Sequence, residues 1–321
     1  MIDRKVGVVE IALQVRGPYS EVLSAALWAE KADLTAFALP DHYLGSSEDH
    51  SAPAWDHFVH LAGLARDTET IELVDLVSPV TFRHPAVHAK MAVTVFDMSK
   101  RDGRPRFTLG LGAGWLLEEH SLFGIPFPAR GPRFEILEEQ LAYLSALRRG
   151  ESFEGGYYRL QEFDHNPTFD VPLLVGGTGG SKTPDLAGRY CDEFNLFPKP
   201  VDDLKERIER CHRAAEKAGR DPKDIKLSFV ATPIAGVDEP TYRRVLEAAA
   251  TEFDREPKVL EERLQARGTP FGTPDRVKTR LDELMGLGIS RLYLQAGTTD
   301  LEELEDRIRP YLEAAGVTNR D

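Results

Sequence analysis

The sequence predicts an α/β fold, a (β/α)8 TIM barrel, and three observations lead to this prediction. Short apolar runs that resemble β-strands alternate with longer amphipathic segments along the whole chain. Regular alternation of strand and helix favours a parallel sheet with right-handed crossovers. Eight such units follow one another without a pause, and eight is the number that closes a barrel. We therefore expect residues 1–321 to form one barrel domain with insertions at its C-terminal mouth.

The eight strand runs are short and mostly apolar, as strands buried in a parallel sheet are. The alternative is an open doubly wound sheet, which usually has fewer strands and often carries a nucleotide fingerprint at its first turn. The first turn here, at residues 12–17, reads ALQVRG and has no such fingerprint. The runs are KVGVVEIA from Lys5, TAFALP from Thr35, TIELVDLV from Thr70, RFTLGLG from Arg106, VPLLVGG from Val171, EFNLF from Glu193, KLSFVAT from Lys226 and RLYLQA from Arg291.

Six segments between these runs have the apolar spacing of amphipathic helices. Thr273 and Pro274 form a helix start, and Gly219 and Gly288 stand where C-terminal caps are expected. Residues 150–170 predict a short hairpin before the fifth strand, an insertion that would shape the substrate mouth. The helical segments are YSEVLSAALWAEKA from Tyr19, DHFVHLAGLARDT from Asp56, PAVHAKMAVTVFDMS from Pro85, PRFEILEEQLAYLSALRRG from Pro132, VDDLKERIERCHRAAEKAG from Val201 and TPDRVKTRLDELMGLG from Thr273.

Composition and charge argue against several classes of partner. The chain has 40 basic and 53 acidic residues, a net charge of −13, which would repel nucleic acid and anionic membrane surfaces. It has no uninterrupted apolar run of membrane-spanning length and no signal-peptide core. Cys191 and Cys211 have neither zinc-ligand spacing nor the density of a disulfide scaffold. We expect a soluble cytoplasmic protein that acts on a small molecule.

In a barrel of this kind the chemistry lies where strands end, so polar residues after each strand form one ring of candidates. Asp41 and His42 follow the second strand, and a histidine beside a carboxylate can hold a proton near neutral pH and be oriented by its neighbour. The alternative is that the pair only caps a loop. The ring consists of Glu10, Asp41, His42, Ser78, Gly112 to Trp115, Gly176 to Gly180, Asn195, Thr232 and Gln295.

The histidine pairs at helical spacing do not favour a metal site. His84 and His88 are four residues apart, but no glutamate stands between them in zinc-protease register and Pro85 starts a helix there. The same argument applies to His57 and His60. We therefore expect no metal.

Two glycine loops follow the fourth and fifth strands. In Gly110-Leu-Gly-Ala-Gly-Trp115 the third glycine of a dinucleotide fingerprint is replaced by Trp115, so a Rossmann site is excluded. What remains is a close backbone approach to a flat or anionic group, or a tight turn that needs positive φ. Gly176–Gly180 lies between a strand and a helix, where backbone amides favour an anion, although a flexible turn is the alternative. It lacks the Gly-Lys-Ser/Thr ending of a nucleoside triphosphate loop.

Taken together, these segments resemble the bacterial luciferase-like flavin and deazaflavin oxidoreductases, and most closely the branch that uses coenzyme F-420, a deazaflavin. The resemblance covers nearly the whole chain in order, and the combination of GLGAGW, EEH and FGIP is specific. It is carried by LPDHYLG at Leu39, TFRHPAVHAK at Thr81, FTLGLGAGWLLEEHSLFGIPFP at Phe107, GPRFEILEEQLAYLSALRRG at Gly131, YYRL at Tyr157, VPLLVGGTGG at Val171, LAGRYCDEFN at Leu186 and GTPDRVKTRLDELMGLGISRLYLQ at Gly272.

The resemblance implies roles for particular residues. Asp41 and His42 would lie at the reactive ring, with His42 transferring the proton. A non-prolyl cis peptide and bulge at the end of the third strand would back the ring. The two glycine loops would hold the phosphate side of the cofactor. The cofactor-binding set implied in this way is Leu76, Val77, Ser78, Gly112, Ala113, Gly114, Trp115, Gly176, Gly177 and Thr178.

Trp115 is also a departure from the family pattern. The sugar-phosphate dehydrogenases of the family have an acidic glutamate directly after the fourth-strand glycine loop, and this sequence has Trp115 there. That argues against sugar-phosphate oxidation. Together with Phe197 and Tyr43, Trp115 indicates a flat-walled apolar pocket, although each aromatic side chain could equally belong to the core.

Three functional hypotheses follow. The first is an F-420-dependent oxidoreductase that transfers a hydride between the cofactor and an organic substrate, while the protein supplies orientation. The second is a monooxygenase that uses reduced FMN and oxygen. The third is a flavin-binding protein with little turnover. The resemblance also implies a homodimer.

Overall fold

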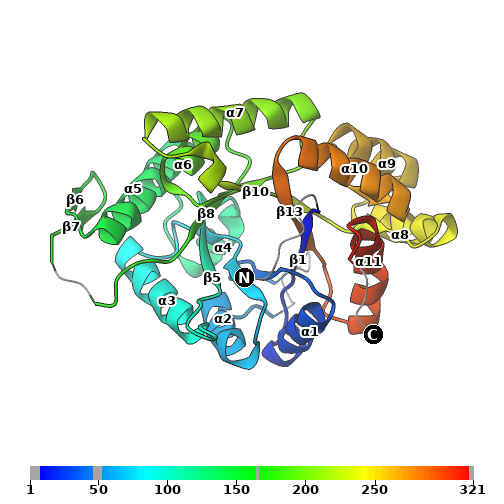
Figure 1. Ribbon diagram of the computed structural model, residues 1–321, viewed down its shortest axis with the longest axis horizontal. Helices are drawn as coiled ribbons and strands as arrows, with labels where there is room; N and C mark the ends of the chain where they lie inside the picture. Colours follow the sequence, from blue (N-terminus) through cyan, green and yellow to red (C-terminus); the bar gives the residue numbers. More distant parts are fainter. Residues whose placement is uncertain (1–7, 46–52, 164–165, 318–321) are drawn as a thin grey trace.

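The computed structural model describes residues 8–45, 53–163 and 166–317, and it contains a closed parallel β-barrel with helices around it (Figure 1). The strand order is β3-β2-β1-β13-β10-β9-β8-β5, and β3 pairs with β5 to close the ring. This confirms the predicted (β/α)8 barrel. The barrel strands are β1 (Glu10–Gln14), β2 (Ala36–Leu39), β3 (Glu72–Asp75), β5 (Phe107–Gly112), β8 (Leu173–Gly176), β9 (Glu193–Leu196), β10 (Lys226–Ala231) and β13 (Ile289–Gln295).

All eight predicted strand runs contain a barrel strand, and only their ends differ. The first run was expected from Lys5, but β1 begins at Glu10; residues 5–7 lie outside the described part of the chain. β13 begins two residues earlier than expected, because Ile289 pairs with Leu227 across a register shift in β10. A short strand, β4 (Ser78–Pro79), continues the line of β3 and also pairs with β5.

Side chains alternate between the inside of the barrel and the helical layer, as the period of a strand requires. Ile11 and Leu13 of β1 belong to the large core cluster with the helices, whereas Ala12 belongs to a separate buried cluster. Small residues from several strands meet in that second cluster, and Tyr293 fills part of the space they leave. The inner cluster consists of Ala12, Ala36, Ala38, Val74, Leu76, Leu174, Val230 and Tyr293.

The predicted helices are all present, and their ends follow the expected punctuation. Gly219 and Gly288 lie just beyond α7 and α10 with φ of 73° and 84°, which favours glycine. Thr273 is the N-cap residue of α10, but its side chain makes no cap hydrogen bond. The helices are α1 (Tyr19–Lys31), α2 (His57–Asp67), α3 (Pro85–Met98), α4 (Leu117–Phe123), α5 (Arg130–Arg149), α6 (Lys182–Tyr190), α7 (Val201–Lys217), the short 3-10 helix η1 (Pro222–Asp224), α8 (Glu239–Glu252), α9 (Pro257–Ala266), α10 (Pro274–Gly286) and α11 (Leu301–Ala314).

The expectation that Glu10 belongs to the mouth is wrong. Glu10 is the first residue of β1, and its carboxylate lies 2.8 Å from Arg291 Nε. Arg291 is 1% exposed and also pairs with Glu72 at 2.6 Å and Glu193 at 3.4 Å, which begin β3 and β9. These residues therefore close the amino-terminal end of the barrel. At the mouth the last residue of β1 is Gln14.

The predicted hairpin is present but does not shape the mouth. Strands β6 (Phe153–Glu154) and β7 (Arg159–Leu160) pair in antiparallel fashion and lie outside α5 (Figure 1). Glu139 of α5 accepts hydrogen bonds from the hairpin turn, including the Tyr157 amide at 2.8 Å. The hairpin connects the end of α5 to the start of β8. It therefore lies at the amino-terminal end of the barrel, opposite the mouth. One insertion that does lie at the mouth is α4, directly after β5.

A second insertion follows β10 and has a small core of its own. Strands β11 (Ile234–Ala235) and β12 (Phe271–Gly272) pair in parallel, and α8 and α9 lie between them in sequence. Tyr242, Leu246 and Leu260 pack in this cluster. Of the helices that the structure describes, none is long and apolar enough to cross a membrane.

Candidate active site

A cavity of about 610 Å³ opens at the carboxyl ends of the barrel strands, and most of the predicted site residues line it. Its volume is in the range of small-molecule sites. Asp41 and Ser78, the exceptions, are buried below it, with exposures of 3% and 0%. The lining residues are Pro40, His42, Leu76, Val77, Pro79, Gly112, Ala113, Gly114, Trp115, Arg130, Arg133, Phe134, Leu137, Gly176, Gly177, Thr178, Gly179, Thr183, Phe197 and Gln295.

The end of the third strand forms one wall of the cavity. The peptide bond between Leu76 and Val77 is cis, as the family resemblance implied, and both side chains line the cavity. Gln14 Nε2 donates to the carbonyl oxygen of Leu76 at 2.5 Å, and Gln295 Nε2 donates to Gln14 Oε1. Gln295, which lines the cavity, therefore holds Gln14, and Gln14 in turn holds the carbonyl group of the cis peptide bond.

His42 lies in the cavity wall and is held by a carboxylate from another element. Its Nδ1 lies 3.2 Å from Oε2 of Glu119, in the first turn of α4. Glu119 is only 1% exposed, and it also accepts a hydrogen bond from the Tyr43 amide at 3.1 Å. The indole of Trp115 meets the imidazole edge-on, with 5.9 Å between ring centroids. When Nδ1–H donates the hydrogen bond to Glu119, Nε2 is the nitrogen that can contact a ligand.

Asp41 does not orient His42, which corrects the interpretation of the two as a pair. Its Oδ1 lies 3.0 Å from His57 Nδ1, and its Oδ2 accepts from Ser78 Oγ at 3.0 Å and from Arg83. Burial alone would raise the pKa of Asp41, but the positive charges of His57 and Arg83 hold it well below its usual range. Asp41 is therefore a buried anion that supports the loop carrying His42.

His57 is the second half of this buried cluster. Its Nε2 lies 3.3 Å from Oδ1 of Asp75, the last residue of β3. Burial opposes the charged imidazolium, but the carboxylates of Asp41 and Asp75 raise the pKa of His57 to about 9. Sequence reasoning weighed His57 only as a metal ligand. Within the described ranges, no three His, Cys, Asp or Glu side chains are grouped so that they could hold a metal ion.

The two glycine loops, which follow β5 and β8, lie side by side and line the same cavity. β5 and β8 pair in register at Leu111 and Val175, and a Cβ added at Gly112 would lie 3.5 Å from the carbonyl oxygen of Gly176. Gly177 has φ of 145°, a conformation that side chains rarely adopt. A Cβ at Gly179 would lie 2.3 Å from the Phe134 ring. The loop therefore presents bare backbone at Gly177, where a side chain would be strained, and at Gly179, where a side chain has no room.

This surface fits the phosphate side of a flavin-like cofactor. Helix α6 begins after the loop, but its first turn offers few amides to an anion, because the Thr183 amide donates to the carbonyl oxygen of Gly179 at 3.2 Å and Pro184 has no amide hydrogen. Arg130 and Arg133 from the start of α5 line the same cavity. Amides and guanidinium groups are suitable donors for phosphate oxygens, and the apolar wall at Leu76 and Val77 suits a flat ring.

Other ring members and aromatic residues have different positions from those expected. Asn195 is buried in β9 and donates to Ser228 Oγ at 3.0 Å, while Phe197 beyond the strand lines the cavity. Tyr43 packs on Phe82, with ring centroids 4.5 Å apart, and does not line the cavity. Trp115 does line it but is 73% exposed. The pocket is thus only partly the flat-walled aromatic site that was predicted.

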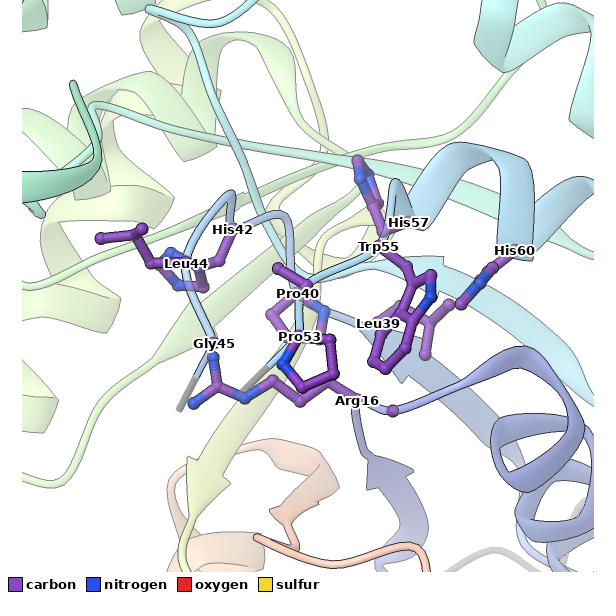
Figure 2. Close-up of a pocket in the computed structure, with 12 residues that line it drawn as sticks. Arg16, Leu39, Pro40, His42, Leu44, Gly45, Pro53, Trp55, His57 and His60 are labelled. Carbon is purple, nitrogen blue, oxygen red and sulfur yellow. The ribbon is translucent and has the colours of Figure 1, made fainter. Parts of the chain in front are cut away.

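A smaller hollow lies on the other side of the His42 loop (Figure 2). It is bordered by Pro40, His42, Trp55 and His60, with Arg16 beneath the loop, and its volume is about 30 Å³. That is room for about one water molecule. Of these two spaces at the His42 loop, only the large cavity has room for a cofactor and a substrate.

Glu119, His57 and Arg83 contact the predicted site residues, and the sequence patterns did not indicate these contacts. Glu119 was quoted within the EEH motif without a role, and nothing in its sequence position indicates contact with His42. Its burial at a first helical turn, next to an exposed Glu118, is visible only in the fold. Arg83 likewise reaches Asp41 from the loop before α3.

The comparisons with known proteins agree with this architecture. The family model of the luciferase-like monooxygenases matches residues 7–291. An F420-dependent glucose-6-phosphate dehydrogenase of Amycolatopsis mediterranei (strain U-32) is 27% identical over 226 residues, which are 65% of this chain and 65% of that protein. The chain thus spans less than two thirds of the length of this curated relative and about half of others it matches.

Two solved structures share the fold along nearly their whole length. An F420-dependent secondary alcohol dehydrogenase in complex with an F420-acetone adduct has a TM-score of 0.76 at 19% identity, with 96% of this chain and 99% of that chain covered. The monooxygenase RslO1 from Streptomyces bottropensis has a TM-score of 0.74 at 21% identity, with 95% and 98% covered. From its barrel, its match over residues 7–291 and these neighbours, this chain belongs to the luciferase-like monooxygenase family of oxidoreductases.

Proposed function

We propose that this protein is a deazaflavin-dependent oxidoreductase that transfers a hydride between coenzyme F-420 and a small organic substrate. The observation that carries the proposal is His42 in the wall of the cavity, fixed by a buried carboxylate and facing the same space as the glycine loops. The similarity to an F420-dependent glucose-6-phosphate dehydrogenase supports F-420 as the cofactor. When bound, the deazaflavin supplies the redox chemistry of hydride transfer.

The protein's own residues then have distinct tasks. Amides of Gly176 to Thr178, together with Arg130 and Arg133, bind the phosphate. Leu76 and Val77 support the ring from one side. Gly112 to Trp115 complete the wall, and the apolar lining excludes water from the reacting atoms.

His42 moves the proton that accompanies the hydride. Glu119 accepts a hydrogen bond from Nδ1–H, which leaves Nε2 to give a proton to a carbonyl oxygen during reduction or to take one from a hydroxyl during oxidation. The buried Asp41, with Arg83 and His57, keeps the loop of His42 in place. Asp41 is thus a positioning residue in this proposal.

The substrate class follows from position 115. The family's sugar-phosphate dehydrogenases place an acidic glutamate there, and Trp115 supplies no proton and no charge. Its indole meets His42 edge-on, so it narrows the space above the imidazole with an apolar surface. We propose an alcohol or carbonyl compound without a phosphate group as substrate, and we propose that the protein acts as a homodimer.

The second candidate is an FMN-dependent monooxygenase, which the family description itself favours. Titration of the purified protein with F-420 and with FMN, followed by fluorescence, separates the two. We expect tight binding of F-420 and weak binding of FMN. Reduced and oxidised F-420 would then be mixed with a panel of carbonyl compounds and alcohols, and turnover followed by deazaflavin absorbance.

Tight FMN binding without F-420 binding, with oxygen consumption in the presence of reduced FMN, would overturn the first candidate. Bound cofactor that persists with every acceptor and donor tried would instead favour a binding protein with little turnover.

A further inference from the structure

Two glutamine side chains lie inside the barrel, directly below its mouth. Ala12 of β1 and Tyr293 of β13 belong to the buried cluster inside the barrel. Side chains two residues further along a strand point to the same face, so Gln14 and Gln295 also point inward, one layer closer to the mouth. The two glutamines are partners in the register of β1 and β13. Gln14 is 4% exposed, whereas Gln295 is exposed and lines the cavity.

The hydrogen bonds of this pair fix the orientation of both side-chain amides. The carbonyl oxygen of Leu76 can only accept, so the group of Gln14 that contacts it is the NH2 group. Gln14 Oε1 is then an acceptor, and the NH2 group of Gln295 donates to it. The remaining atom is Gln295 Oε1, a carbonyl oxygen that accepts no hydrogen bond from any residue in the ranges that the structure describes.

Gln295 lies in the same part of the mouth as His42. In the strand order, β13 and β2 are separated only by β1, whereas β8, which leads into a glycine loop, lies directly across the barrel from β1. Of the described residues that line the cavity, none is an aspartate or a glutamate, and only Gln295 has a side-chain carbonyl group. A hydrogen-bond donor on a substrate beside His42 therefore meets the Gln295 carbonyl oxygen.

The donor that fits this oxygen is a neutral one. Arg130 and Arg133 line the same cavity, and no carboxylate does so among the residues that the structure describes. An ammonium group would be desolvated there near like charges and without a counter-ion, which is costly. A hydroxyl group donates a hydrogen bond without bringing a charge into the cavity.

We infer that Gln295 is a specificity-determining residue that accepts a hydrogen bond from a hydroxyl group of the substrate other than the group that reacts. This inference rests on the proposed function, and it deepens it by naming the substrate class: a carbonyl compound or alcohol with a second, unreacting hydroxyl group. His42 exchanges a proton with the reacting oxygen, and Gln295 holds the second hydroxyl. The contact is binding alone. A substrate without this hydroxyl leaves the buried carbonyl oxygen without a donor, which disfavours that substrate.

The test uses pairs of ketones in which one member has an extra hydroxyl group beside the carbonyl: acetone and hydroxyacetone, cyclohexanone and 2-hydroxycyclohexanone, acetophenone and 2-hydroxyacetophenone. If another substrate is found, the pair is that substrate and its analogue without the hydroxyl. With reduced F-420, kcat/KM is measured for the wild type, Gln295→Leu and Gln295→Met. Because the extra hydroxyl also changes the reactivity of the ketone itself, the ratio of kcat/KM within a pair is compared between proteins. We expect this ratio to be about tenfold higher in the wild type than in either variant.

Gln265→Leu is the matched control, because Gln265 is exposed on α9 and does not line the cavity. It should keep the wild-type ratio, and the affinity of both Gln295 variants for F-420 should stay within about twofold of the wild type. An equal loss on both members of a pair, as a purely structural role or a contact with the cofactor would produce, would overturn the inference, while turnover with F-420 would still support the proposed function. Failure of the wild type to bind F-420 would overturn the proposed function and the inference together.

Discussion

His42 Nδ1 lies 3.2 Å from Glu119 Oε2, although the two residues are 77 positions apart in the sequence. The carboxylate is 1% exposed and is held by the Tyr43 amide as well, so it cannot turn away to water. A histidine held at one nitrogen by a buried carboxylate presents the other nitrogen in a defined tautomer and direction. Two elements, the loop after β2 and α4, thus build the group that we propose transfers the proton.

Glu119→Gln should lower kcat about 10- to 100-fold, with the substrate found in the panel of alcohols and carbonyl compounds, because the imidazolium loses its anionic partner. The affinity for F-420 should change less than about twofold, since Glu119 does not line the cofactor cavity. The tautomer can be read directly from the ¹⁵N shifts of labelled His42, which should show a mixed population in Glu119→Leu.

Glu118→Gln serves as the control for this prediction. Glu118 is the exposed neighbour of Glu119 on α4, so its substitution should leave kcat and the His42 tautomer as in the wild type. An unchanged kcat in Glu119→Gln would remove Glu119 from the proposed role.

Asp41→Asn should destabilise the fold by about 3–5 kcal/mol, because it leaves the Arg83 guanidinium and the charged His57 without their shared anion. Urea unfolding followed by circular dichroism measures the loss. Asp185→Asn removes the partner of Arg210, a pair whose side chains are 39% and 43% exposed, and should cost less than about 1 kcal/mol. Similar losses in the two variants would contradict the buried-cluster interpretation.

Much of the barrel could be predicted from the sequence, because each strand and each helix has its own local pattern of apolar and polar residues. The glycine loops and His42 could be placed at the mouth for the same reason, since they come directly after apolar runs. Glu10 was misplaced because the first apolar run began before the strand, so its polar residue lies at the strand's start. A local pattern identifies a strand, but the strand's ends depend on its neighbours.

The partners of the site residues could not be predicted in this way. Asp41 and His42 are adjacent in sequence, yet they contact His57 and Glu119 respectively, which come from α2 and α4. Which carboxylate meets which imidazole depends on how helices sit on the barrel. The cis peptide at Leu76 came from family resemblance, and no property of its own sequence indicated it.

The burial of His88 predicts that the folded protein loses stability in mild acid. Burial, with the nearby Arg83 charge, lowers the pKa of His88 to about 3. In the unfolded chain its pKa is about 6.5, so between these values only the unfolded chain binds the proton. Stability should therefore fall as pH drops below about 6.5, by at most about 1.4 kcal/mol per pH unit from this group.

The variant that isolates this effect is His88→Leu. It removes the titrating group, so its urea midpoint should depend less on pH between about 5 and 7 than that of the wild type. The control is His212→Gln, on the outer helix α7, whose pH dependence should match the wild type. Parallel pH curves for the wild type and His88→Leu would contradict the prediction.

Gly179→Ala, compared with Gly180→Ala, tests whether the close packing of the glycine loop after β8 is needed for cofactor binding. A Cβ at Gly179 would lie 2.3 Å from Phe134 Cζ and 2.5 Å from Thr183 Oγ1, so the loop must shift. A Cβ at Gly180 meets nothing within 4 Å, and neither glycine has positive φ. Crowding of this kind costs about 1–3 kcal/mol, so Gly179→Ala should weaken binding of F-420 about tenfold or more. Gly180→Ala should stay within about twofold. Because both substitutions add one methyl group to one loop, equal affinities in the two variants would mean that the cofactor phosphate does not depend on the shape of this loop.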